Sequence, residues 1–129
     1  MTMTHMLPRS SAPREDALSA GDVRTLKAHF EATNFEVKVD GQGFAWTAID
    51  GIEVAAAARQ RSPSGWIVRN LIFGGKDRFH VGIYSGEHEL VLINLTLEAA
   101  RYVVQTIAYY ARNRIPFTGP EGLTATAEE

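Results

Sequence analysis

The spacing of the hydrophobic residues changes near Thr96. Between residues 35 and 95, apolar positions alternate with polar ones or form short runs, separated by segments such as Asp-Gly, Gly-Gln-Gly and Gly-Gly. Beyond Thr96 they recur at helical spacing, at Leu97, Ala100, Val104, Ile107, Ala108, Ala111 and Ile115. Alternation is typical of half-buried strands, and a spacing of three or four residues is typical of an amphipathic helix. The pattern predicts an α+β domain with a short N-terminal helix, an antiparallel β-meander of about six strands and a long C-terminal helix packed on the sheet.

The first helix is predicted to begin at Ser19, which can cap it together with Asp22 three residues later. This helix should end near Asn34, and its apolar stripe consists of Val23, Leu26 and Phe30. The long helix should begin at Thr96, a good N-cap residue, and stop before Pro116.

Two turns are predicted in the first half of the meander. Residues 40–43 can connect a strand at 35–39 to one at 44–49. Asp50-Gly51 matches a two-residue type I′ turn, which needs a positive φ at both positions. This pairing predicts one shared face formed by Phe35, Val37, Val39, Phe44, Trp46, Ala48, Ala55 and Ala57.

Three further strands are predicted at residues 66–73, 78–84 and 89–95. If four-residue loops connect them, one face is apolar and forms the core, with Trp66, Val68, Ile72, Phe79, Val81, Ile83, Leu90 and Leu92. On the other face Arg69 should oppose Gly82, and Glu89 should oppose Tyr84.

A single domain is expected at residues 19–117. Residues 1–18 lack periodicity and are interpreted as a flexible arm, and residues 118–129 as an acidic flexible tail. A chain of 129 residues can bury one core. It contains no cysteine, which excludes disulfides, thiolate metal sites and cysteine nucleophiles.

The formal net charge of −2 is unevenly distributed. Residues 59–115 carry eight basic and four acidic side chains, whereas residues 1–58 carry five and eight. The total disfavours a wholly basic nucleic-acid binder, but the second half offers a positive field. No apolar stretch reaches the length of a signal peptide or a membrane span, so we expect a cytoplasmic protein that does not associate with membranes.

The polar face of the last three strands is a candidate anion site. Its residues are Arg69, Arg78, His80 and Tyr84, whose guanidinium, imidazole and phenol groups could receive a phosphate or a carboxylate. Gly82 in mid-strand would let a ligand or another backbone approach closely. The alternative is a solvated sheet face on which arginine and tyrosine pair with Glu89.

A nucleic-acid surface is a second candidate. Basic residues interleave with aromatic ones over part of the chain, and the basic candidates are Arg59, Arg61, Arg69, Lys76 and Arg78. A β-meander followed by a helix is similar in topology to the Whirly family of single-stranded-DNA-binding transcription regulators. That resemblance implies the same class of ligand.

The far side of the long helix is a candidate protein interface. Its residues are Tyr102, Val103, Thr106, Tyr109 and Tyr110, and tyrosine is favoured at interfaces because its ring buries area while its hydroxyl stays hydrated. If exposed, they would form a homodimer seam. The alternative is that both sides of this helix pack inside one subunit.

Catalytic and metal-binding patterns are weak. His80 and His88 lie too far apart along one hairpin to share a metal ion, and Ser85 lacks the frame of a nucleophile elbow. We therefore expect no cofactor, no metal site and no enzymatic activity.

The sequence favours a regulatory or inhibitory binding module that docks on a protein partner. Single-stranded nucleic-acid binding is the first alternative, and a small anionic-ligand pocket or enzyme site around Arg69, His80 and Tyr84 is the second.

Overall fold

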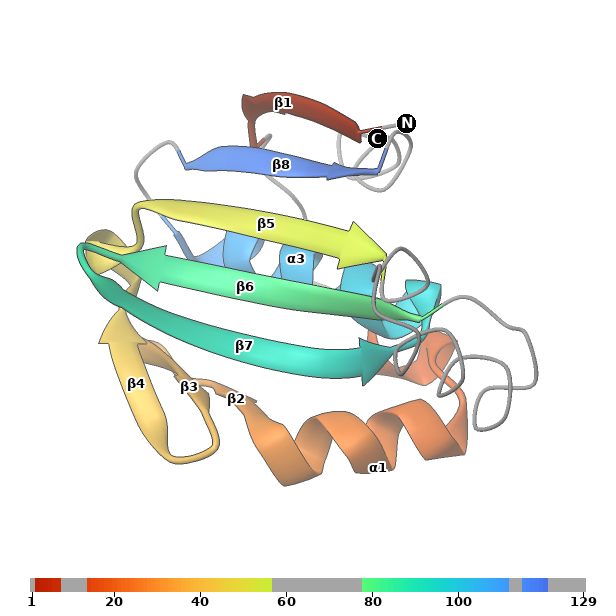
Figure 1. Cartoon of the computed structure of the whole chain (residues 1–129). Coiled ribbons are helices and arrows are strands. Elements are labelled where there is room, and N and C mark those ends of the chain that lie inside the picture. Colours follow the sequence, from red (N-terminus) through yellow and green to blue (C-terminus); the bar gives the residue numbers. More distant parts are fainter. Residues whose placement is uncertain (1, 8–13, 57–77, 112–114, 121–129) are drawn as a thin grey trace.

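The computed structural model describes residues 2–7, 14–56, 78–111 and 115–120. They form eight strands in two sheets and two α-helices, so the α+β class is confirmed (Figure 1). In chain order the elements are β1 (Thr2–Met6), a 3₁₀ turn (Glu15–Ala17), α1 (Ala20–His29), β2 (Phe30–Ala32), β3 (Glu36–Val39), β4 (Gln42–Ala45), a second 3₁₀ turn (Trp46–Ala48), β5 (Gly51–Ala56), β6 (Phe79–Ser85), β7 (His88–Leu95), α3 (Leu97–Tyr110) and β8 (Pro116–Pro120).

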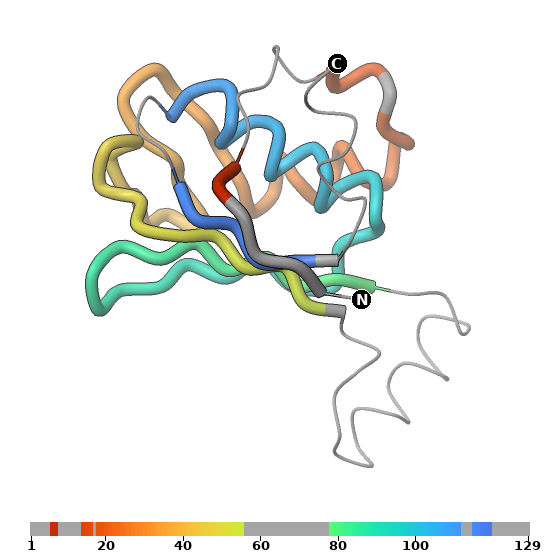
Figure 2. Tube along the Cα trace, turned by 90° about the horizontal axis from the view of Figure 1, so that it is seen from above, coloured from red at the N-terminus to blue at the C-terminus, as the bar shows by residue number. Residues whose placement is uncertain are grey.

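The strands do not form the single meander that the sequence predicts. One sheet has five strands in the order β1-β8-β5-β6-β7, and the other has three in the order β2-β3-β4. All neighbours are antiparallel except β5 and β8, which run parallel. Figure 2 shows both helices on the same side of the five-stranded sheet. The topological likeness to the Whirly family rested on one continuous meander, so this arrangement removes its basis.

The core lies between the five-stranded sheet and α3. The predicted apolar face of β6 and β7 is confirmed, since Phe79, Val81, Ile83, Leu90 and Leu92 are all buried. The helix covers this face with small and β-branched side chains, namely Ala99, Ala100, Val103, Val104, Ile107 and Ala108. Removing these apolar surfaces from water is the main driving force for this packing.

Both predicted helix starts are confirmed. The Ser19 hydroxyl accepts the backbone N–H of Asp22, and the Thr96 hydroxyl accepts that of Ala99. The predicted end of the first helix is wrong, because α1 stops at His29 and Phe30 begins β2, opposite Val39. Burying Phe30 in the small sheet outweighs the helical pattern that includes it.

One of the two predicted turns is confirmed and the other is wrong. Asp40 and Gly41 have φ values of 51° and 87° and connect β3 to β4 as a two-residue turn. Asp50-Gly51 makes no hairpin, since Gly51 begins β5 and pairs with Tyr84. Ile52 and Val54 are therefore buried, and Ala55, assigned to the core face, is exposed.

Both ends of the described chain belong to the sheet. Residues 2–6, expected in a flexible arm, form β1, and residues 116–120, which overlap the expected tail, form β8. The two strands pair antiparallel, and the backbone N–H of Leu7 donates to the Ile115 carbonyl at 2.8 Å. Phe117 is fully buried and pairs with Ile52 of β5, which holds β8 in the sheet.

The predicted strand at 66–73 lies outside the described residues. The two positions beside Gly82 on β6 belong to Glu53 of β5 and Val91 of β7. The predicted cross-strand pair of Arg69 with Gly82 is therefore wrong. The predicted pair of Tyr84 with Glu89 is confirmed.

Candidate functional site

Tyr84 lies on the outer face of the five-stranded sheet between two carboxylates. Its hydroxyl donates to Glu53 Oε1 at 2.9 Å, and its ring covers Gly82, where an added Cβ would be 3.0 Å from the tyrosine oxygen. Burial, followed by the hydrogen bond and the charge of Glu53 and then those of Glu89, raises the pKa of Tyr84 far above its ordinary value. The close approach that Gly82 permits is thus used by the protein's own tyrosine.

His80 lies on the same face, further along β6. Its Nδ1 accepts the backbone N–H of Asn94 at 3.3 Å, and burial lowers the pKa of His80, so the ring is neutral at pH 7. A neutral imidazole and a phenol held by carboxylates do not favour binding of an anion. Arg78 directly precedes β6, and Arg69 lies outside the described residues, so the four-residue anion site stays a prediction.

The basic candidates for nucleic-acid binding lie almost entirely outside the described residues. Only Arg78 belongs to the described part, and Arg59, Arg61, Arg69 and Lys76 do not. In the described part, acidic side chains outnumber basic ones. The nucleic-acid hypothesis therefore stays a prediction.

The candidate interface on α3 divides into buried and accessible residues. Val103 is fully buried and Thr106 is 2% exposed, with its hydroxyl donating to the Tyr102 carbonyl at 2.7 Å. For these two residues the burial agrees with the alternative, in which both sides of the helix pack inside the subunit. α3 contacts β6 and β7 of the sheet, and it also contacts α1. Tyr109, by contrast, is 43% exposed, and Tyr102 and Tyr110 pack half-buried against the core.

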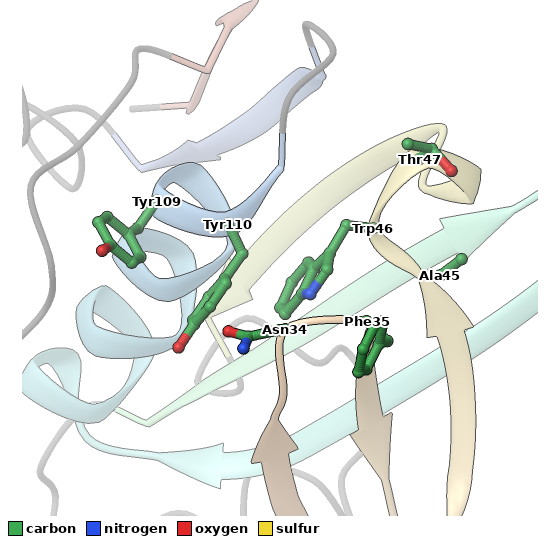
Figure 3. Close-up of a pocket in the computed structure, with 7 residues that line it drawn as sticks. All are labelled: Asn34, Phe35, Ala45, Trp46, Thr47, Tyr109 and Tyr110. Atoms are coloured by element: carbon green, nitrogen blue, oxygen red, sulfur yellow. The ribbon is translucent and has the colours of Figure 1, made fainter.

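The accessible tyrosines border a groove at the C-terminal end of α3. Its volume is about 480 Å³, and it is lined by Asn34, Phe35, Ala45, Trp46, Thr47, Tyr109 and Tyr110 (Figure 3). The Trp46 and Tyr110 rings stack with centroids 4.9 Å apart and planes 10° apart. The Tyr109 ring meets that of Tyr110 edge to face at 5.0 Å. Stacked and edge-to-face ring pairs of this kind stabilise one another beyond the area they bury.

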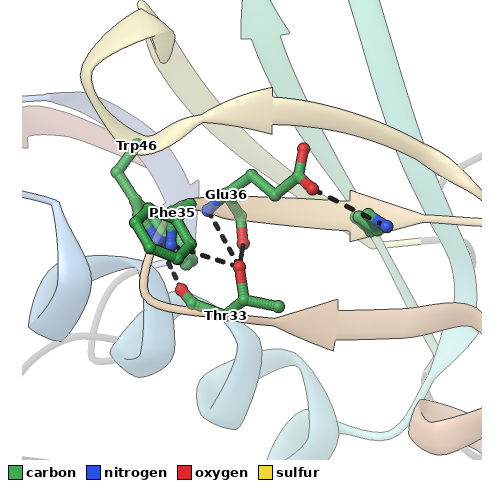
Figure 4. Close-up of polar contacts among 5 residues, drawn as sticks. Thr33, Phe35, Glu36 and Trp46 are labelled. Atoms are coloured by element: carbon green, nitrogen blue, oxygen red, sulfur yellow. Dashed lines mark hydrogen bonds and ion pairs between the residues drawn. The ribbon is translucent and has the colours of Figure 1, made fainter.

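Thr33 holds the opposite wall in place (Figure 4). Its hydroxyl donates to the Glu36 carbonyl and accepts the backbone N–H groups of Phe35 and Glu36, at 3.1–3.2 Å. Its carbonyl accepts the Trp46 Nε1–H at 2.7 Å. This bonding closes the loop between β2 and β3 tightly and leaves the Phe35 side chain 83% exposed.

A second space continues the groove along α3. It has a volume of about 350 Å³, shares Tyr109 and Tyr110 with the first, and is also lined by Glu15, Leu26, Lys27, Phe30, Glu31, Ala32, Tyr102 and Thr106. Burial, and then the negative charge of Glu15, raises the pKa of Tyr102. We call the two spaces together the tyrosine groove.

The sequence points to some of the residues that line the tyrosine groove and not to others. Tyr102, Tyr109 and Tyr110 stand out as aromatic residues beyond the apolar stripe of the helix, whereas Phe35 and Trp46 are assigned to the core face of a strand. A signal for Phe35 does exist, since a threonine two residues before it can form a side-chain turn that takes Phe35 out of the strand.

Known proteins give no indication of what this chain does. No protein-family model, no curated protein and no solved structure gives a significant match to the chain. Neither described helix has the length and apolar character needed to cross a bilayer.

Proposed function

We propose that this protein is a non-enzymatic docking module that binds a segment of another protein in the tyrosine groove. The observation that carries the proposal is the exposure of Phe35 directly beside the stacked rings of Trp46 and Tyr110. A phenylalanine ring left in water gives up roughly 1.5–3 kcal/mol that burial would supply. Exposed aromatic rings around a concave surface are typical of interface hot spots.

The lining of the groove indicates which segment fits. Aromatic walls favour an apolar or aromatic side chain as the anchor, and the tyrosine hydroxyls can bond a peptide backbone that passes over them. At the other end, the acidic Glu15 and Glu31 outnumber the basic Lys27. A segment with an apolar anchor followed by a lysine or arginine complements both parts.

A different protein is a better partner than a second copy. Two of the five residues of the homodimer seam predicted on α3, Val103 and Thr106, are buried, so that seam offers less surface to a second copy. Docking on another protein can regulate or inhibit it by covering its surface, which needs no catalytic residue.

Selection from a displayed peptide library tests the proposal. Enriched peptides should share an apolar anchor and a nearby basic residue, and Phe35→Ala and Tyr109→Ala should each weaken their binding about tenfold or more. Because Phe35 is exposed, Phe35→Ala should leave the melting temperature unchanged within about 2 °C. Ile93→Ser, which also removes an exposed apolar side chain but on the outer sheet face, is the matched control and should bind normally.

Two results would contradict this function. One is enrichment of peptides whose binding is indifferent to Phe35→Ala and Tyr109→Ala. The other is a dimer in light scattering that Tyr109→Glu converts to monomer, since the groove would then be occupied by a second copy.

A further inference from the structure

The free edge of the large sheet is a second surface, and the residues that line it are different from those of the tyrosine groove. Among the described residues, β7 is the last strand of the five-stranded sheet. It is joined to β6 by the two-residue turn Gly86-Glu87, in which Gly86 has a φ of 59°, and Ser85 pairs with His88 across it. This turn determines which residue pairs of the hairpin are hydrogen-bonded and which are not.

This alternation determines which backbone N–H and C=O groups of β7 are available to another strand. Residues that flank a two-residue turn form a hydrogen-bonded pair, and bonded and non-bonded pairs then alternate along an antiparallel ladder. His88, Leu90 and Leu92 therefore point their backbone groups toward β6. Glu89 and Val91 point theirs away from it, and no described element supplies a hydrogen-bond partner to these groups.

A groove lies beside the C-terminal part of β7 and overlaps the open edge at Val91 and Leu92. It has a volume of about 420 Å³ and lies between residues 91–95 of β7 and the side chains of Thr25, His29 and Asp40. His29 Nδ1 and Asp40 Oδ1 are 2.6 Å apart and connect the end of α1 to the β3–β4 turn. Figure 1 shows α1 and β7 running roughly in the same direction across the view, and the groove lies where their residues meet.

A β-bulge limits the length of the open edge. Val81 pairs with Leu92 and Phe79 with Leu95, so Ile93 and Asn94 together face His80. Asn94 has a φ of 60° and donates its N–H to His80 rather than to the edge. Bulges bend a strand and end regular pairing, so the edge accepts a partner only over His88–Leu92, about five residues.

The side chains at the edge indicate the chemistry of the partner. Val91 and Ile93 are 40% and 58% exposed on the outer face, and the exposed Glu89 precedes them. Cross-strand pairs favour opposite charges and apolar or β-branched neighbours. In antiparallel self-pairing over His88–Leu92, the Glu89 carboxylate of each copy would face Val91 of the other, so a second copy fits poorly.

We propose that β7 binds an extended segment of a partner protein as an additional strand, with a lysine or arginine opposite Glu89 and valine or isoleucine beside Val91. Backbone hydrogen bonds provide the affinity in this mode of recognition, and the alternate side chains provide the specificity. The site does not depend on the tyrosine groove.

Binding of a short, end-blocked peptide in which valine and lysine alternate tests this proposal. Val91→Pro removes an N–H that points away from β6, so the hairpin is kept while the edge loses a donor. The affinity measured by fluorescence anisotropy should fall at least tenfold. Phe35→Ala should leave it unchanged, which separates this site from the tyrosine groove. The same peptide with N-methylated valines should not bind.

A second measurement on the unmodified protein covers the case in which Val91→Pro does not fold. Hydrogen exchange of the Glu89 and Val91 amides should slow when the peptide is added, while the Leu90 amide, bonded to β6, changes little. Equal affinity for Val91→Pro and the wild type, unaltered exchange at Glu89 and Val91, or a dimer that Val91→Pro dissociates would each overturn the proposal.

Discussion

Tyr84 shows how a single residue can determine what a surface offers. Its ring covers the backbone at Gly82 and its hydroxyl is held by Glu53. The space that the sequence suggests above Gly82 is therefore occupied by the Tyr84 ring, and the Tyr84 hydroxyl already donates its hydrogen bond to Glu53. At this place the outer face of the sheet presents carboxylates and a tyrosine hydroxyl that stays protonated.

Gly82→Ala should displace this tyrosine. The new methyl group would lie 3.0 Å from the Tyr84 oxygen and 3.2 Å from its ring carbon, closer than normal contact. The free energy of unfolding should fall by about 1 kcal/mol in chemical denaturation. The pKa of Tyr84, followed by NMR, should move back toward its ordinary value. A pKa that does not change would mean that Glu53 holds the ring without help from the glycine.

His80 gives stability a dependence on pH in the mildly acidic range. Burial lowers its pKa in the folded state, so the unfolded chain binds more protons below about pH 6.5. This contribution is fully present above about pH 6.5 and is lost as the pH falls toward the lower folded value. His80→Asn keeps an acceptor near the Asn94 N–H but does not titrate.

The melting temperature should therefore fall less in His80→Asn than in the wild type between about pH 7.5 and about pH 5. Parallel curves for the two proteins would show that His80 titrates alike in the folded and unfolded states.

At the scale of elements, local signals determine where helices start but not where they end. Ser19 and Thr96 cap as predicted because a hydroxyl can satisfy a free N–H without help from the rest of the fold. The end of α1 and the turn at Asp50-Gly51 depend on distant partners. Phe30 is paired by Val39, and Gly51 by Tyr84, so tertiary contacts override the local preference.

The helix caps are also coupled to each other. The Thr96 hydroxyl donates to Asp22 Oδ2 at 2.8 Å while it accepts the Ala99 N–H, so one side chain joins the starts of α1 and α3. Thr96→Ala should lower the free energy of unfolding by about 1–2 kcal/mol. Thr96→Ser, which keeps the hydroxyl, should lose much less.

A double-mutant cycle with Asp22→Ala checks this coupling. The two substitutions together should destabilise by about 1 kcal/mol less than the sum of the single changes. Strict additivity would show that the caps act separately.

Over the whole molecule, the sequence predicts the layers better than their order. The buried face of β6 and β7 and the helix that covers it follow from periodicity alone. The division into two sheets and the position of β8 between β1 and β5 do not, because pairing between strands far apart in the chain leaves no local signal. Only half of the tyrosine groove can be predicted for the same reason, since Phe35 reaches it from the loop between β2 and β3 and Trp46 from the 3₁₀ turn after β4.

The position of strands in the sheet also sets their local stability. β6 is paired on both sides along its length, whereas β1 is an edge strand held by β8 alone. Native-state hydrogen exchange should therefore be fastest at β1 and slowest at β6. Equal protection of the two strands would indicate that the sheet opens only as one unit.

The pairing of β1 with β8 has a consequence for biosynthesis. β1 can pair only after β8, which lies far along the chain, has left the ribosome, so β1 waits while everything between the two strands is synthesised. Closing so large a loop costs conformational entropy and is therefore slow. Pairing of β1 with β8 is for this reason a late folding event. Until β8 docks, the border of β5 stays open to wrong associations, and this is the interval in which a chaperone would be of use.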